Sequence, residues 1–483
     1  MTAALKPATV PAAAGLLALP GFAVLGLLTA YEPVMAVGLA GGIGLLVIWY
    51  LRPAVGLAVW SVSFFIPYSI LGNLLLKGGF VVAVAVTGLH LVAEPASAVA
   101  GVRDYRWPVV TVGALLAWLA ATVLWAADPM AAVAELAVWL LTAGVFAVTL
   151  ATTRTVASIE TVLWGVMAGG GLAAATALFP IGGPVGSLDG TVLRSGGAAG
   201  DPNILAAGLV AVLALCPGMW GVARSASGRW AAVLVGALCL GGIIASASRG
   251  ALVAAGCALA VTVLLSAHPG RLIAGLAVPV AALIATWATF WSTSWSRVTD
   301  FGGGGTGRTE LWRAAWEVWG HRPVTGVGVG NLIVVERSVA LELGSLSHAD
   351  LIAERPLVAH NTTLQFLSET GIIGLALFVA VVAVSVGAAR DAAVRFHHHG
   401  RPDLARMANA LIAAIAGLIG ASLFLSMGRE YRVWLLLACG PALAHIARTM
   451  NPGRPAPVSL SVPVSSPTGD ETPRARTERP VRR

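Results

Sequence analysis

Charged side chains are scarce in this chain of 483 residues, because Asp, Glu, Lys and Arg together make up only 11% of it. Hydrophobic residues make up 57%, and the mean hydropathy is +0.85. Since an ordinary soluble domain carries about 25% charged residues, this composition excludes a water-soluble globule. The sequence therefore predicts a polytopic membrane protein.

Cysteine is also scarce, and its spacing excludes two further classes of protein. The four cysteines fall inside apolar runs and lack the spacing of a disulfide framework or a metal site. We interpret them as small core residues: Cys216, Cys239, Cys257 and Cys439. The loops that we place outside the membrane show no acidic cluster of the kind that holds a divalent metal, so we expect neither metal nor cofactor.

The net charge of +8 comes from arginines that are dispersed among loops and the C-terminal segment. A protein that binds nucleic acid gathers such residues on one basic face, so we do not expect nucleic acid as a partner. We expect membrane lipids instead.

Long apolar runs without strict alternation favour transmembrane helices over a β-barrel, and only these two structures satisfy the backbone in lipid. Each run has about the twenty residues that the bilayer requires. We predict an all-α polytopic membrane protein with about fourteen transmembrane helices. The spans lie near residues 12–30, 34–50, 54–72, 79–97, 108–126, 131–151, 159–179, 203–222, 230–247, 251–267, 272–291, 371–389, 407–426 and 433–449. Because many spans follow the first, we interpret it as an uncleaved helix and not as a signal peptide.

Orientation follows from the arginines of the short loops, which stay on the cytoplasmic side of a membrane. If the N-terminus is cytoplasmic, most loop arginines fall on that side, and the outer loops keep chiefly Lys77, Arg429 and Arg432. We therefore predict that both termini are cytoplasmic.

The predicted spans divide the chain into five segments. We expect N-terminal transmembrane helices, central helices with outward arginines, a large extracytoplasmic loop carrying short helices, C-terminal helices, and a disordered cytoplasmic tail rich in Pro, Ser, Thr and Arg. Their ranges are 1–180, 181–291, 292–370, 371–449 and 450–483. A loop as long as the third segment is usually functional.

Two outward arginines stand out near the central helices. Arg249 lies between two apolar runs, where a cation is costly unless it faces a cavity or a partner, although a snorkelling arginine at a helix end is the alternative. Arg194 precedes a helix start at which Asp201 is expected to be the N-cap and Pro202 the first helical residue. Arg194 has no such local role and is a candidate for binding an anion. Asn203 stays without an assigned role.

The glycine-rich stretch 302–309 matches a phosphate-binding loop except that Arg308 replaces the lysine. No buried strand precedes it and it faces away from cytoplasmic ATP, so we exclude a nucleotide site. We predict instead that Thr309 caps a helix over Glu310–Trp319 and that Arg308 stands at its N-terminus, an arrangement suited to a phosphate oxygen.

Three tryptophans of that helix, Trp312, Trp316 and Trp319, recur at i, i+4 and i+7 and would form one aromatic face. This face either lies on the surface of the outer leaflet or packs against the transmembrane bundle. The glycine run 326–330 is not part of a βαβ unit, so we interpret it as a tight turn. Glu135 lies inside a span and has either a functional role or a local ion pair.

His360 is the strongest candidate for acid–base chemistry. A helix is expected to follow it, and the positive end of the helix dipole favours a neutral imidazole, as a base near neutral pH requires. The alternative is that a lone histidine is structural.

The order of these features resembles the O-antigen ligase and polymerase superfamily over roughly Gly186 to Arg432. The features are the outward Arg before a Pro-Asn helix start, the Ser-Arg-Gly between spans, the Gly-Arg before a Trp-rich helix and the Gly-Val-Gly-Val-Gly turn. The most specific feature is His360-Asn361, followed after nine residues by Gly371-Ile372-Ile373-Gly374.

This resemblance implies a membrane glycosyltransferase at the outer face of the cytoplasmic (inner) membrane. It would move a glycan from an undecaprenyl-pyrophosphate carrier to a hydroxyl of a glycan, lipid or protein acceptor. Arg249 and Arg308 match arginines thought to hold the donor pyrophosphate, and Arg194 matches more loosely. His360 matches the essential histidine.

We expect Asn361, Asn203 and Asp201 to support this site. Guanidinium groups that neutralise the pyrophosphate would make a metal unnecessary. The competing hypothesis is a transporter or flippase of a lipid-linked saccharide, which would need charged residues along a route through the bundle; such residues are scarce.

Overall fold

The computed structural model describes residues 33–67, 70–93, 104–179, 185–186, 193–290, 308–343 and 358–450. The helices are α2 (Pro33–Leu51), α3 (Pro53–Ser63), α4 (Ile70–Ala93), α6 (Arg106–Thr122), α7 (Pro129–Thr152), α8 (Val156–Leu178), α9 (Pro202–Val222), α10 (Ala226–Ser246), α11 (Arg249–Leu264), α12 (Pro269–Phe290), α14 (Arg308–His321), α15 (Leu332–Leu343), α17 (Thr362–His398), α18 (Pro402–Ala421) and α19 (Tyr431–Thr449). Two short 3-10 helices, η1 (Val123–Trp125) and η2 (Gly197–Ala199), accompany them. One antiparallel pair, β1 (Val185–Gly186) with β2 (Leu193–Arg194), precedes α9.

The predicted all-α architecture is confirmed for this part of the chain. Every predicted span from 34–50 onward overlaps a helix. Within the described residues, eight helices are long and apolar enough to cross a membrane, namely α6, α7, α8, α9, α10, α12, α17 and α18. Shorter apolar helices lie within α2, α3, α4 and α11. The total of about fourteen stays a prediction, because the four shorter helices and α19 are not among the eight and the span at 12–30 lies outside the described residues. The predicted disordered tail beyond Met450 also lies outside the described residues.

Polar residues mark the points where apolar helices begin. Asp201 is the N-cap of α9, as predicted, and its Oδ1 accepts hydrogen bonds from the amides of Asn203 at 2.7 Å and Ile204 at 2.9 Å. Asp128 caps α7 in the same way. In each helix a proline follows at the first position, where its missing amide proton costs nothing. These caps satisfy helix amides that have no partner inside the helix.

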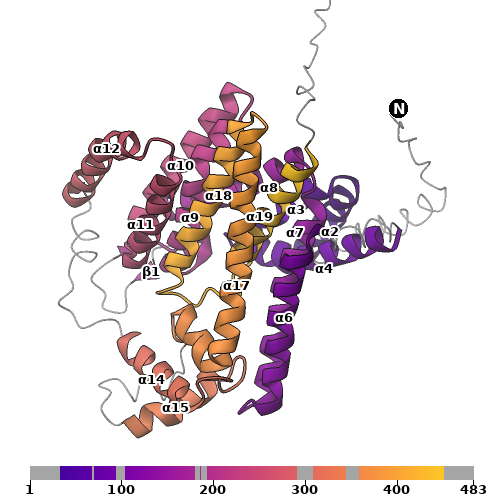
Figure 1. The fold of residues 1–483 in the computed structure, drawn as a ribbon, viewed down its shortest axis with the longest axis vertical. Helices are drawn as coiled ribbons and strands as arrows, with labels where there is room; N and C mark the ends of the chain where they lie inside the picture. Colours follow the sequence, from indigo (N-terminus) through magenta and orange to yellow (C-terminus); the bar gives the residue numbers. More distant parts are fainter. Residues whose placement is uncertain are drawn as a thin grey trace, which may run out of the picture. The chain divides into compact units, whose positions relative to one another are not determined.

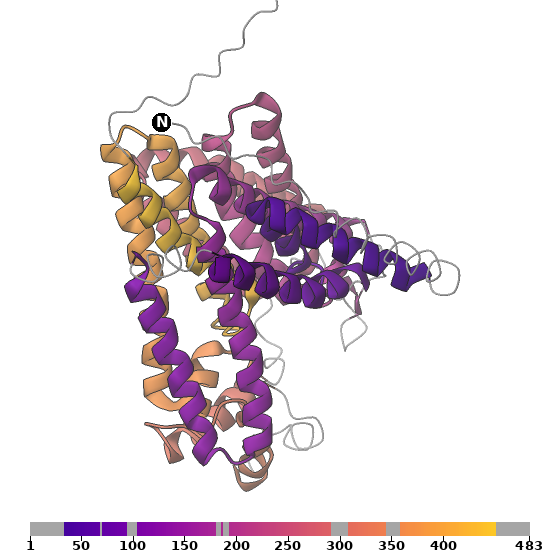
Figure 2. The ribbon, with the colours of Figure 1, turned by 90° about the vertical axis from the view of Figure 1, so that its right-hand side faces the viewer.

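The helix α9 lies at the centre of one side of the bundle, packed against α18, α10, α8 and α11 (Figure 1). Close approach depends on small residues: a Cβ on Gly218 of α9 would lie 2.6 Å from the Cβ of Ala410 in α18. Small residues at helix contacts allow this packing in lipid, where water does not drive helices together. The long helix α17 packs along α19 and α6, while α2, α3 and α4 lie together at one side (Figure 2).

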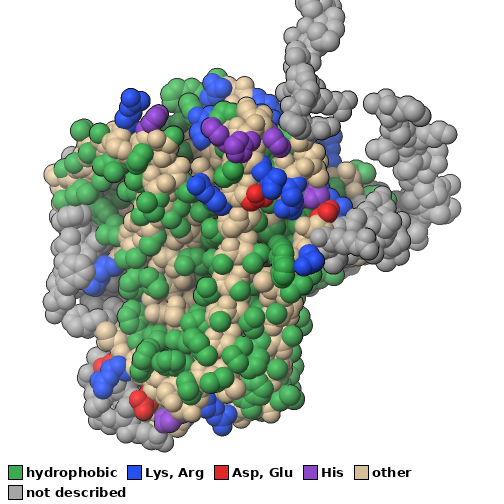
Figure 3. Space-filling model, in the orientation of Figure 1, with side chains coloured by type: hydrophobic (Ala, Val, Ile, Leu, Met, Phe, Trp, Pro, Cys, Tyr) green, Lys and Arg blue, Asp and Glu red, His purple; other side chains and the backbone are tan. Residues whose placement is uncertain are grey.

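Charged side chains gather at one end of the molecule. Figure 3 shows Arg and His side chains around the upper ends of α17 and α18, above a broad band of hydrophobic side chains. Ion pairs at this end join Arg395 to Asp391 at 2.9 Å and Arg401 to Asp403 at 2.7 Å. An apolar band between polar ends is what a bilayer requires. That this end is cytoplasmic stays a prediction.

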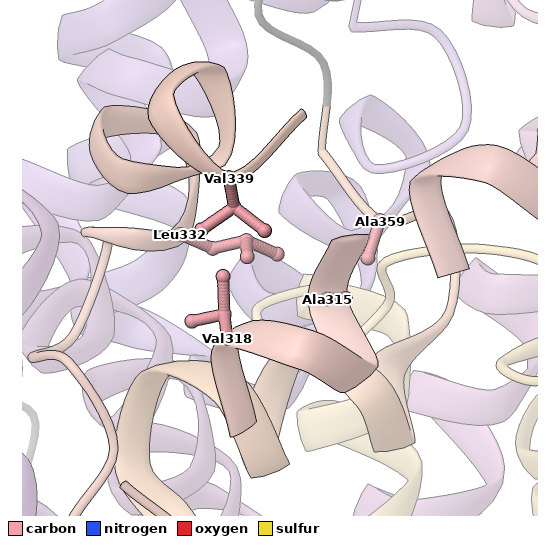
Figure 4. Close-up of a cluster of buried hydrophobic side chains, with 5 residues drawn as sticks. All are labelled: Ala315, Val318, Leu332, Val339 and Ala359. Atoms are coloured by element: carbon pink, nitrogen blue, oxygen red, sulfur yellow. The ribbon is translucent and has the colours of Figure 1, made fainter. Parts of the chain in front are cut away.

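At the other end, α14 and α15 of the predicted extracytoplasmic loop pack beside the beginning of α17 (Figure 1). They share a small core in which Val318 of α14 and Leu332 and Val339 of α15 point toward one another (Figure 4). Ala359, next to His360, belongs to the same core. This part of the loop is therefore a folded layer with a core of its own.

The predicted tight turn at 326–330 is confirmed, and it docks onto an interruption in α17. Gly326, Gly328 and Gly330 have φ of 68°, 107° and 71°. Gly371 breaks the helical geometry of α17 with φ 68° and ψ −172°, a conformation that essentially only glycine adopts. The amide of Gly328 donates to the carbonyl of Glu369 at 2.8 Å, so the turn satisfies the backbone that the break exposes.

We expect Gly371→Ala to lower the free energy of unfolding by at least about 2 kcal/mol, because a residue with a Cβ is strained in the backbone conformation of Gly371. That Cβ would also lie 2.0 Å from the carbonyl oxygen of Val324. Gly387→Ala is the matched control, since Gly387 lies on the same helix and its Cβ would meet nothing within 4 Å. Thermal unfolding in detergent, followed by tryptophan fluorescence, measures both. Equal unfolding temperatures for the two variants would contradict this account of the break.

Candidate functional site

Arg249 is placed by a left-handed turn between α10 and α11. The C-cap of α10, Ala247, has φ 47° and ψ 40°. The hydroxyl of the following Ser248 donates to Oδ1 of Asn203 at 2.8 Å. Asn203 is the second residue of α9, two residues after the cap at Asp201, so this bond joins the start of α11 to the start of α9. Arg249, at the first position of α11, is half-buried.

His360 lies on a second left-handed turn, with φ 47°. Among the described residues, positive φ outside glycine occurs only at Ala247 and His360. Such conformations are costly for residues with a side chain and persist where the surroundings enforce them. Here the neighbouring Thr362 provides that enforcement: its Oγ1 donates to the carbonyl of Leu425 and accepts from the amide of Met427, both at 2.8 Å.

The helix predicted after His360 is confirmed. It is α17, and the side chain of Asn361 caps it by accepting from the amide of Leu364 at 3.0 Å. Asn361 thus has a structural function next to the candidate base. His360 itself is half-buried and stands two residues before the first residue of the helix.

Arg308 is the first residue of α14, two residues before the helix start predicted from the sequence. Thr309 therefore lies inside the first turn of the helix. The prediction that Thr309 is the N-cap of this helix was wrong. The indole of Trp312, one turn further on, donates to the carbonyl of Ala359 at 3.0 Å. This bond fixes the helix that carries Arg308 to the segment that carries His360.

The predicted aromatic face of α14 is divided. Trp312 points inward and lies 6.0 Å, centroid to centroid, from the ring of Phe424. Trp316 is 55% exposed and packs edge-on against Trp319, which donates to the carbonyl of Pro323. Trp312 therefore contacts the bundle, as one of the two sequence-based alternatives predicted, and the contact of this face with the outer leaflet stays a prediction.

Phe424 links the segment that carries Arg249 to the helix that carries Arg308. A Cβ on Gly250, directly after Arg249, would lie 3.4 Å from the Cβ of Phe424. The aromatic ring therefore stands between the beginning of α11 and Trp312 of α14. The sequence analysis missed Phe424, because a single phenylalanine in an apolar segment carries no signal of its partners.

The charges of the site act on one another. Burial lowers the pKa of His360, the positive charge of Arg308 lowers it further, and Asp201 opposes them. Burial and the charge of Arg249 lower the pKa of Arg308, again opposed by Asp201. Four residues from four elements thus form one electrostatic group. Near neutral pH it presents two guanidinium groups, one carboxylate and a neutral imidazole, which suits an anionic ligand.

The structure confirms some of the remaining sequence predictions and leaves others as predictions. Arg194 belongs to β2 and pairs with Val185 through its backbone, while the position of its side chain lies outside what is described, so its role stays a prediction. Asn203 holds Ser248, as described above. Glu135 forms an ion pair with Arg429, which confirms the local alternative for that residue. In the described part of the chain, no three His, Cys, Asp or Glu side chains gather as they would around a metal ion.

A second residue that the sequence analysis left without a role is Arg432. It is 4% exposed, pairs with Glu430 at 2.8 Å and donates to the carbonyl of Ile204 at 3.2 Å. It therefore anchors the first turn of α9, where Asp201 and Asn203 lie. The available signal was its position in a loop predicted to face outward, where arginines are not expected.

Comparison with known families places the core of this site in a recognised segment. Residues 234–379 match the family model described as O-Antigen ligase, which covers less than a third of the chain. The match includes Arg249, Arg308 and His360. It confirms the resemblance to the O-antigen ligase and polymerase superfamily and indicates a membrane enzyme of glycan ligation or polymerisation. No curated protein matches the chain significantly.

The electrostatic group can be tested without any enzymatic assay. We expect the pKa of His360 to lie below its ordinary value of 6.5, to rise in Arg308→Gln and to fall further in Asp201→Asn. The pH dependence of its modification by diethyl pyrocarbonate, followed by peptide mass spectrometry, reports this pKa. Arg313→Gln, which changes an exposed arginine of the same helix, is the control. An identical midpoint in wild type and Arg308→Gln would disprove the coupling.

Proposed function

We propose that this membrane protein is a metal-independent glycosyltransferase of the O-antigen ligase and polymerase type. It moves a glycan from an undecaprenyl-pyrophosphate carrier to a hydroxyl of a glycan, lipid or protein acceptor, at the extracytoplasmic face of the cytoplasmic membrane. The observation that supports this most strongly is the convergence of His360, Arg308, Arg249 and Asp201 from four separate elements.

The two arginines have the chemistry that the leaving group requires. As the bond between the anomeric carbon and the pyrophosphate oxygen breaks, negative charge accumulates on the pyrophosphate. Guanidinium groups preorganised for that charge stabilise the transition state more than the bound substrate. Arg308 acts together with the first amides of α14, because a helix N-terminus also favours a phosphate oxygen.

His360 supplies the base. Its imidazole is neutral near pH 7, because burial and Arg308 both disfavour the charged form. The acceptor hydroxyl gives its proton to the free ring nitrogen, its oxygen bonds to the anomeric carbon, and the lipid pyrophosphate departs with the electrons of the broken bond. Asp201 partly offsets the two arginines and stabilises the imidazolium that forms.

The principal prediction concerns the base. His360→Ala and His360→Asn should each lower glycan transfer by at least about a hundredfold, the usual contribution of a general base. Transfer by the purified protein in detergent, from a synthetic lipid-pyrophosphate donor, measures this loss. Asparagine tolerates the left-handed backbone of this position, so its variant separates the lost base from altered folding.

His321→Ala, at the exposed end of α14, should retain full transfer. Wild-type turnover in either His360 variant would overturn the catalytic assignment. Donor binding without any transfer by the wild-type protein would instead favour the flippase hypothesis, because transport needs two membrane faces and transfer does not.

The arginines are tested with lysine, which keeps the charge and loses the planar fork that binds two phosphate oxygens. Arg249→Lys and Arg308→Lys should each lower kcat/KM for the donor by about ten- to a hundredfold. Arg313→Lys, on the exposed face of α14, should change it less than about twofold, because interactions of exposed charges contribute little. If both site variants kept the wild-type kcat/KM, the proposed pyrophosphate clamp would be wrong.

A further inference from the structure

A separate pocket lies far from His360 along the helix α17. It has a volume of about 660 Å³ and is lined by the beginning of α6, the later part of α17 and the end of α19. Its lining residue Ala388 lies about 25 Å along α17 from Gly371, given the rise of about 1.5 Å per residue. This separation approaches the thickness of the hydrocarbon core, so the pocket is near the opposite membrane surface from the candidate site.

One side of the pocket is rich in arginine. Arg448 lies 4.0 Å from Asp391, which also pairs with Arg395 at 2.9 Å, while Asp104 lies 3.5 Å from His445. The guanidinium of Arg106 lies 4.7 Å from the ring centroid of Trp107. Two arginines and two aspartates line the pocket itself, namely Arg106, Arg448, Asp104 and Asp391. Two further arginines act at its edge: Arg395 pairs with Asp391, and the charge of Arg154 acts on Tyr105. With these two included, the arginines outnumber the aspartates, and this excess of positive charge favours an anionic ligand.

A buried hydroxyl in the pocket lacks a partner. Tyr105 is only 4% exposed, it lines the pocket, and its Oη has no hydrogen bond. Burial raises the pKa of Tyr105 to about 12, against the opposing charge of Arg154, so the group stays a hydrogen-bond donor at physiological pH. A buried donor without an acceptor costs about 1–3 kcal/mol, so its position favours a ligand with an acceptor oxygen.

The other side of the pocket is an apolar groove made by small residues of α17 and α19. Its lining includes Val384, Gly387, Ala388, Pro441 and Ala444. A Cβ on Gly387 would meet nothing within 4 Å, which leaves room along this helix. Trp107, beside the arginines, is 61% exposed, as is typical of a tryptophan at a membrane surface. The pocket therefore joins a cationic end to an apolar groove.

We propose that this pocket binds an anionic phospholipid, with its phosphate held by Arg106, Arg448 and the hydroxyl of Tyr105. One acyl chain lies along the groove between α17 and α19. Arginine-rich pockets between transmembrane helices suit acidic headgroups. The headgroup of phosphatidylcholine is zwitterionic, and its cationic choline would be repelled by the arginines. This site is separate from the candidate site, because the two share no residue.

The test uses the full-length protein, stripped of lipid in detergent and examined by native mass spectrometry with added lipids. Wild type should retain phosphatidylglycerol in preference to phosphatidylcholine. Arg106→Gln, Arg448→Gln and Tyr105→Phe should each weaken phosphatidylglycerol binding by about tenfold, the size expected for a lost charge-assisted hydrogen bond. Arg224→Gln is the control, since this arginine is 80% exposed in the loop between α9 and α10.

Gly387→Leu tests the groove, because its side chain would occupy the space of the acyl chain. It should weaken lipid binding and leave the unfolding temperature unchanged. Equal retention of the two lipids would overturn the anionic headgroup. Unchanged retention in Tyr105→Phe and Arg106→Gln would place the lipid elsewhere, and glycerol phosphate binding as tightly as the lipid would identify a site for free phosphate instead.

Discussion

The interruption of α17 at Gly371 is the constraint on which the position of the candidate site depends. A broken helix exposes backbone groups that lipid does not satisfy, so each needs a partner from the protein. The turn at 326–330 bonds the carbonyls of Ser368 and Glu369, the indole of Trp118 bonds that of Thr370, and the carbonyl of Pro323 accepts from the amide of Ile372. The hydrogen bonds at the break therefore hold α6, α17 and residues 323–330 in fixed positions relative to one another. The position of His360, directly before α17, depends on these contacts at Gly371.

The candidate site is assembled in the same manner, from short segments that other contacts hold in place. The hydrogen bond from Ser248 to Asn203 joins two helix starts, and Trp312 joins α14 to the residue before His360. No single element carries His360 and both arginines, Arg249 and Arg308. Burial reinforces the chemistry of this group, because burial and the charge of Arg308 both disfavour the protonated form of His360.

Features with a local cause could be predicted from the sequence. Helix spans follow from the apolar length that a bilayer requires, and the cap at Asp201 and the glycine turn follow from the backbone preferences of single residues. The sequence also indicated the start of a span at 371, but α17 is helical on both sides of that residue. Which tryptophan of α14 turns inward depends on Phe424, more than a hundred residues away. Contacts of this kind have no local sequence signal, and they determine which residues come together in the candidate site.

Two independent requirements meet at His360, and the first is its left-handed backbone conformation. The residue has to enter a region of φ that Gly, Asn, Asp and His tolerate best, and under the proposed function it also has to accept a proton near neutral pH. Histidine is the residue of this group whose ordinary pKa lies closest to neutrality. A replacement at this position therefore has to satisfy the backbone and, under the proposed function, the proton transfer as well, so similar size and polarity alone do not make a residue a substitute for histidine there.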